Sequence, residues 1–126
     1  ARKQGIKTAV ATSSFGWRTK EILELLKIEK LFDAIVSVDN ITRGKPFPDS
    51  YLAAAKAIGV EPEHCVVIED APKGITAGNS AGMKTIGVLT KEQTRKELSE
   101  ADIIVNNVED ITIEIARDLF SRGTTL

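Results

Sequence analysis

The sequence predicts an α/β domain built on a doubly wound parallel sheet of five strands, with helices on both faces. Five short runs rich in valine and isoleucine alternate strictly with segments of helical periodicity. Such alternation is typical of parallel sheets that are covered on both sides. The 126 residues suit one domain, residues 1–126, with a single hydrophobic core.

The apolar runs place the predicted strands at Thr8–Thr12, Ala34–Val38, Val66–Ile68, Thr85–Leu89 and Ile103–Val105. Helical spacing of apolar residues places the predicted helices at Arg18–Lys27, Asp49–Ile58, Lys73–Ser80, Glu92–Ser99 and Glu109–Leu119. Proline residues stand where the second and third helices should begin, and glycine residues where they should end. These positions are Pro48, Pro72, Gly59 and Gly82.

Composition and charge exclude several classes of function. The net charge of −1 does not favour binding to nucleic acid or to an anionic membrane. Apolar runs are too short to span a bilayer, and no signal peptide opens the chain, so we expect a cytoplasmic protein. With one histidine, His64, and one cysteine, Cys65, a zinc site is not expected. A metal here would be a hard ion held by oxygen atoms.

Polar residues follow the first and third predicted strands, where ligands bind in doubly wound sheets. Thr12 ends the first strand, and its hydroxyl could donate to a phosphate oxygen. Ser13 and Ser14 precede a helix, whose N-terminus favours an anion, although either serine could simply cap that helix. Glu69 and Asp70 end the third strand, where they could cap the next helix or present oxygen atoms to Mg²⁺.

Lys45 stands in a loop just before the helix predicted at Asp49–Ile58 and precedes Pro46 and Pro48. A loop lysine is commonly a solvated charge. The two prolines restrict the backbone around it, however, and an ammonium held in place is more useful against phosphate than a mobile one. Lys45 is therefore a candidate phosphate-binding residue.

The order of these motifs resembles that of the haloacid dehalogenase-like (HAD) hydrolase superfamily, in its phosphoglucomutase-like phosphatase subgroup. The motifs are Thr-Ser-Ser, then Gly-Lys-Pro-x-Pro-Asp, then Val-Ile-Glu-Asp-Ala-Pro-x-Gly-Ile-x-Ala-Gly-x-x-Ala-Gly-Met. The resemblance implies that Thr12 and Ser13 contact a transferring phosphoryl group and that Lys45 balances its charge. It also implies that Glu69 and Asp70 hold Mg²⁺, and that the Lys45–Pro46 peptide bond is cis.

The resemblance further implies hydrolysis of a small phosphorylated metabolite, such as a sugar phosphate, through an aspartyl-phosphate. The family's nucleophile lies in an Asp-x-Asp-Gly-Thr motif, which is absent from this sequence, and so is the cap domain. The opening residues read as the end of a helix, so we expect the C-terminal portion of a HAD core, inactive alone but part of an enzyme. Phosphomutase activity, or an inert module that binds phosphate or Mg²⁺, remains an alternative. A phosphoacceptor receiver domain is disfavoured, because it needs acids where Thr12 and Ser13 stand.

In the resembling family the absent strand lies between the strands that end at Thr12 and Ile68. Its loss leaves two options for the sheet. The two strands could pair directly, giving the order 2-1-3-4-5, or the missing N-terminal half or a second copy of the chain could fill the gap. We expect direct pairing.

Overall fold

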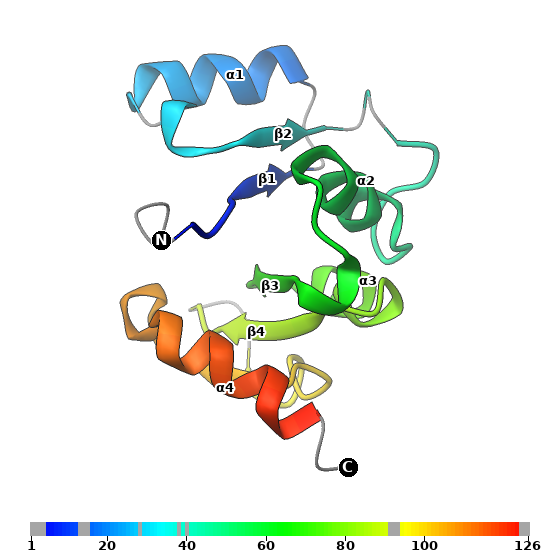
Figure 1. The fold of residues 1–126 in the computed structure, drawn as a ribbon, viewed down its shortest axis with the longest axis vertical. Coiled ribbons are helices and arrows are strands. Elements are labelled where there is room, and N and C mark those ends of the chain that lie inside the picture. Colours follow the sequence, from blue (N-terminus) through cyan, green and yellow to red (C-terminus); the bar gives the residue numbers. More distant parts are fainter. Residues whose placement is uncertain are drawn as a thin grey trace.

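The computed structural model describes residues 5–12, 16–27, 29–37, 39, 41–90 and 94–123 of the chain. Within these ranges the strands form two parallel sheets (Figure 1). In the first, β1 (Ala9–Ala11) pairs with β2 (Ala34–Val36). In the second, β4 (Lys84–Val88) lies between β3 (Val66–Glu69) and β5 (Ile103–Val105). The α-helices are α1 (Gly16–Leu25), α2 (Asp49–Ile58), α3 (Pro72–Ser80) and α4 (Ile113–Gly123), and short 3₁₀ helices span Glu29–Leu31, Pro62–His64 and Val108–Asp110.

The expectation of one five-stranded sheet with the order 2-1-3-4-5 is wrong. No pairing joins β1 to β3 in the described part of the chain. A cavity of about 950 Å³ lies between them, lined by β1, β3, α2 and α4. Ile68 of β3 lines this cavity and is 51% exposed, although it stands in the middle of an apolar strand. We call this cavity the inter-sheet gap.

Helix packing explains why the gap does not close. The second helix, α2, packs on β1 and β2, whereas α3 packs on β3 and β4, and the two helices contact each other. Packed helices lie about 8–10 Å apart, whereas neighbouring strands lie about 4.8 Å apart. Because α2 and α3 are already in contact, they limit how closely β1 and β3 beneath them can approach each other.

One apolar cluster connects the two sheets beneath these helices. It contains Tyr51 and Ala55 of α2, Val67 of β3, and Ala77 of α3. Ala11 of β1 packs against the same cluster. The core therefore holds the sheets together through the helices, although the strands themselves do not pair across the gap.

The boundaries of α2 and α3 follow the local signals in the sequence. Pro48 immediately precedes α2, and Gly59 ends it with a φ of 70°, a left-handed conformation that favours glycine. Pro72 is the first residue of α3, where the missing N–H leaves no helical hydrogen bond unmade. No helix in the described ranges is both long and apolar enough to cross a membrane.

Two predicted helices differ from those observed. Residues 94–100 form hydrogen-bonded turns where a helix was predicted over 92–99, and residues 91–93 lie outside the described part. Within this turn Leu98 alone is buried, so a short helix would have no apolar face to stabilise it. The last helix begins at Ile113 rather than Glu109, because Asn107 and Asp110 close a capping box around the preceding 3₁₀ turn.

Candidate active site

A largely buried ion pair lies at the carboxyl end of β3. Glu69 is the last residue of that strand, and its Oε2 lies 2.8 Å from the Nζ of Lys45, which comes from the loop before α2. The two side chains are only 11% and 16% exposed. Hydrogen bonding between opposite charges makes burial of such a pair tolerable, whereas either charge alone would be costly.

Three further donors hold the Glu69 carboxylate. The hydroxyl of Tyr51, from the first turn of α2, donates to the same Oε2 that Lys45 contacts. The backbone N–H groups of Asp70 and Ala71 donate to Oε1 at 3.3 and 3.4 Å. Burial alone would raise the pKa of Glu69, but the hydrogen bonds from Lys45 and Tyr51 outweigh this effect and lower it. Burial, and then the contact with Glu69, raise the pKa of Tyr51, so its phenol stays protonated.

Asp70 has a different environment from its neighbour. Its side chain is exposed, and its carboxylate has no hydrogen bond or ion pair with any residue that the structure describes. A carboxylate with open lone pairs beside a second carboxylate fits the donor preference of Mg²⁺, which takes one or two acids plus water and phosphate. No group of three or more acids, histidines or cysteines that could hold a metal occurs in the described ranges. Within the part of the chain that the structure describes, Glu69 and Asp70 would supply only part of such a coordination shell.

The first strand reaches the same edge of the fold through Thr12, which directly follows β1. Its backbone N–H donates to the carbonyl of Val36 at 2.9 Å, which continues the pairing of β1 with β2. Ser13, the second predicted phosphate-binding residue of this segment, lies outside the described residues. The first helix begins at Gly16, whose N–H donates to Oδ2 of Asp39 at 2.8 Å. One amide of this N-terminus therefore already has an acidic partner.

The loop that carries Lys45 is braced at both ends. Arg43 forms an ion pair with Asp49 at 3.1 Å, and its guanidinium lies 4.4 Å from the centroid of the Phe47 ring. The Lys45–Pro46 peptide bond is cis, as the resemblance implied. Lys45 therefore extends from a backbone anchored to the start of α2.

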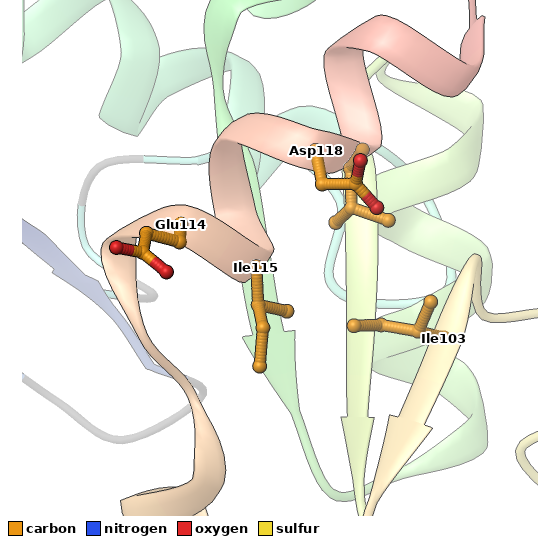
Figure 2. Close-up of a pocket in the computed structure, with 5 residues that line it drawn as sticks. Ile103, Glu114, Ile115 and Asp118 are labelled. Atoms are coloured by element: carbon orange, nitrogen blue, oxygen red, sulfur yellow. The ribbon is translucent and has the colours of Figure 1, made fainter.

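A second cavity, of about 500 Å³, lies between α4 and β5 (Figure 2). Ile103 and Ile115 face this space, whereas the carboxylate of Glu114 points away from it. Ile103 is the first residue of β5, so this cavity lies at the opposite end of the strand from a carboxyl-end site. Its lining is mainly aliphatic, and it adds no group to the site around Glu69.

Of the residues that the sequence singled out, the structure brings Lys45 and Glu69 into contact and places Asp70 beside them. Sequence reasoning missed Tyr51 and Asp39 as polar partners. Tyr51 has the helical spacing of a core residue and is indeed buried, so the sequence pattern gave no sign that its hydroxyl contacts Glu69.

Comparisons with known proteins place these residues in context. The family model for haloacid dehalogenase-like hydrolases matches residues 1–88. Hexitol phosphatase A of Escherichia coli is 36% identical over 113 residues, which are 88% of this chain and 50% of that protein. Beta-phosphoglucomutase of Bacillus subtilis is 37% identical over 117 residues, or 93% of this chain and 49% of that protein.

The fold has matches among solved structures. Beta-phosphoglucomutase from Clostridium difficile superposes with a TM-score of 0.88 at 28% identity, covering 99% of this chain and 53% of that one. The chain thus spans about half the length of the relatives it matches.

Proposed function

Because this chain belongs to the haloacid dehalogenase-like hydrolase family, in its phosphoglucomutase-like subgroup, we propose that it supplies one side of a Mg²⁺-dependent phosphatase site. The substrate class is a small phosphorylated metabolite, such as a sugar phosphate, by analogy with the hexitol phosphatase relative. The observation that carries this proposal is the Lys45–Glu69 pair, with the open carboxylate of Asp70 beside it, at the carboxyl end of β3.

Each residue would have a distinct task at this site. Lys45 offers an ammonium to the phosphoryl oxygen atoms, and its pairing with Glu69 holds it in place. The Thr12 hydroxyl, and that of Ser13 beside it, would donate hydrogen bonds to the same phosphoryl group. These side chains belong to segments on either side of the inter-sheet gap, so the phosphoryl group would lie at the mouth of the gap.

Asp70 and Glu69 are the residues that would hold Mg²⁺. Asp70 has the open carboxylate, whereas Glu69 has an oxygen whose backbone contacts are long, at 3.3 and 3.4 Å. When bound, Mg²⁺ would supply charge stabilisation for the phosphoryl oxygen atoms. The remaining ligands would have to come from water, from substrate and from outside this chain.

The nucleophile would also come from outside this chain. A single extended strand in the inter-sheet gap could pair with β1 on one side and β3 on the other, and so satisfy both open edges. An aspartate at its carboxyl end would stand between Thr12 and Lys45. Its carboxylate oxygen would bond to phosphorus as the bond to the leaving alcohol breaks and that alcohol takes up a proton; water would then cleave the aspartyl-phosphate to phosphate. Residues 1–126 would be the C-terminal portion of this core, and the strand would belong to the N-terminal half or to a second copy.

A phosphomutase is the second candidate. The similarity to beta-phosphoglucomutases over nearly the whole chain favours it, and the same lysine, hydroxyl and carboxylates would serve a mutase equally well. A catalytically inert module that binds phosphate or Mg²⁺ is the outcome expected for the chain without the aspartate-bearing strand.

The test uses the intact protein, meaning this chain together with the segment that carries the aspartate. Phosphate release from a panel of sugar phosphates should require Mg²⁺ and should be abolished by Asp70→Asn. Glu63→Gln, which neutralises another exposed acid, is the matched control and should leave turnover unchanged. Near-normal turnover of Asp70→Asn would exclude the metal role of Asp70. The isolated chain should show no phosphatase activity, and turnover by a pure sample would refute the external nucleophile.

A further inference from the structure

The Glu69 carboxylate is held by more donors than the proposed chemistry requires. Its Oε2 accepts from Lys45 and Tyr51, and its Oε1 from two backbone amides. A carboxylate has about four lone-pair sites, two on each oxygen, so Lys45 and Tyr51 account for Oε2, whereas Oε1 has only the two long backbone contacts. Tyr51 is the one side chain among these donors that has no task in the proposed reaction.

We propose that Tyr51 is a positioning residue, whose hydroxyl fixes the Glu69 carboxylate and, through it, the ammonium of Lys45. Lys45 and Tyr51 donate to one and the same oxygen of Glu69, so that oxygen must lie where both donors can reach it. The ammonium also lies 5.0 Å from the centroid of the Tyr51 ring, where the face of the ring attracts a cation. Two separate contacts therefore connect Tyr51 to the position of Lys45.

The location of the three side chains supports this role. Lys45, Tyr51 and Glu69 all line the inter-sheet gap, on the α2 and β3 side. The ring of Tyr51 is anchored in the apolar cluster with Ala55, Val67 and Ala77, so its hydroxyl is held by a rigid support. An anchor of this kind can restrain a flexible lysine better than solvent-exposed partners can.

Removal of the hydroxyl alone should loosen Lys45. In Tyr51→Phe the ring keeps its packing, but Oε2 of Glu69 retains only one donor, so the carboxylate and the ammonium gain freedom. Small displacements of groups that position a reacting centre cost much in rate. This expectation rests on the proposed function. Lys45 stabilises the charge on the phosphoryl oxygen atoms mainly in the transition state, so we expect kcat to fall about tenfold while KM changes less than about twofold.

The experiment compares Tyr51→Phe with Ser50→Ala in the intact protein. Ser50 is the neighbouring residue on α2 and is 2% exposed, and its hydroxyl has no partner among the described residues, so Ser50→Ala removes a buried hydroxyl that does not touch Glu69. Four quantities are measured for each variant: kcat and KM on a sugar phosphate with Mg²⁺, the melting temperature, and the ¹⁵N signal of the Lys45 side-chain ammonium. That signal is assigned by its loss in Lys45→Arg, and it persists only while the ammonium is hydrogen-bonded and exchanges slowly with water.

The proposal is supported if Tyr51→Phe lowers kcat and weakens the Lys45 ammonium signal whereas Ser50→Ala does neither. It is overturned if Tyr51→Phe behaves like Ser50→Ala, or if it lowers kcat while the Lys45 signal is unchanged. A wild-type protein without phosphatase or mutase activity would instead refute the proposed function. The Lys45 signal in Tyr51→Phe would then decide the positioning role alone.

Discussion

The substitution Gly74→Ala tests the arrangement around Glu69 without changing any polar side chain. Gly74 lies in the first turn of α3, and a Cβ atom there would be 2.1 Å from both Cδ and Oε2 of Glu69. No carbon can approach a carboxylate so closely. Because the carboxylate is the end of a flexible side chain, it can swing away, but only by leaving Lys45 and Tyr51.

The magnitude follows from the contacts that Glu69 would give up. Loss of a buried charged partner leaves Lys45 and the Tyr51 hydroxyl without their acceptor, at a cost of roughly 1–3 kcal/mol each. Replacing glycine by alanine within a helix returns up to about 1 kcal/mol. We therefore expect a net loss of about 2–3 kcal/mol, or about 4–12 °C in the melting temperature of an intact protein of roughly 150–250 residues. Turnover should fall by about 100-fold or more, since the ammonium of Lys45 loses its anchor.

Thermal denaturation and phosphate release from the intact protein measure both effects. Gly44→Ala is the matched control, because Gly44 directly precedes Lys45, yet a Cβ there would meet nothing within 4 Å. It should change neither quantity appreciably. A Gly74→Ala variant with the melting temperature and turnover of wild type would show that Glu69 does not occupy the position described here.

Three further outcomes are expected for the intact protein. Lys45→Met should lower turnover by about 100-fold, because the phosphoryl group loses its cation. It should also lower the melting temperature, because the Glu69 carboxylate loses its ion-pair partner. Full activity of this variant in a phosphate-release assay would contradict the role of Lys45 in balancing the phosphoryl charge. Folding lowers the pKa of the Glu69 carboxyl. The ionised carboxylate therefore stabilises the folded protein fully at pH values above its ordinary pKa of 4.5, and this stabilisation is lost as the pH falls through the folded-state pKa. Melting temperatures taken between about pH 5 and 3 should therefore drop more steeply for wild type than for Glu69→Gln, and parallel curves would disprove this linkage. The N–H of the buried residue Thr85 donates to Oδ2 of Asp102 at 2.7 Å, and Asp102→Ala removes this acceptor. The free energy of unfolding in urea should fall by about 1–3 kcal/mol with an unchanged m-value. An unchanged midpoint would show that water replaces the carboxylate.

The sequence by itself determined the local elements of this protein. Pro48, Gly59 and Pro72 set the ends of α2 and α3, because proline and glycine restrict or permit backbone angles whatever surrounds them. The strands were likewise located to within two residues, since their apolar runs lie between turn-forming segments. Glu69 and Asp70 could be identified as candidate site residues, because the local pattern shows where a strand ends and ligands bind at the carboxyl ends of parallel strands.

Only the tertiary structure decided how these elements meet. The spacing of the two sheets depends on the width of α2 packed against α3, which no periodicity encodes, and so the expected closure of the sheet did not occur. The role of Tyr51 was hidden for a similar reason: its apolar ring follows the helical pattern, whereas its hydroxyl depends on where β3 places Glu69, 18 residues away. Backbone preferences act within a few residues, but the position of a polar atom at the end of a buried side chain depends on the packing of the whole core.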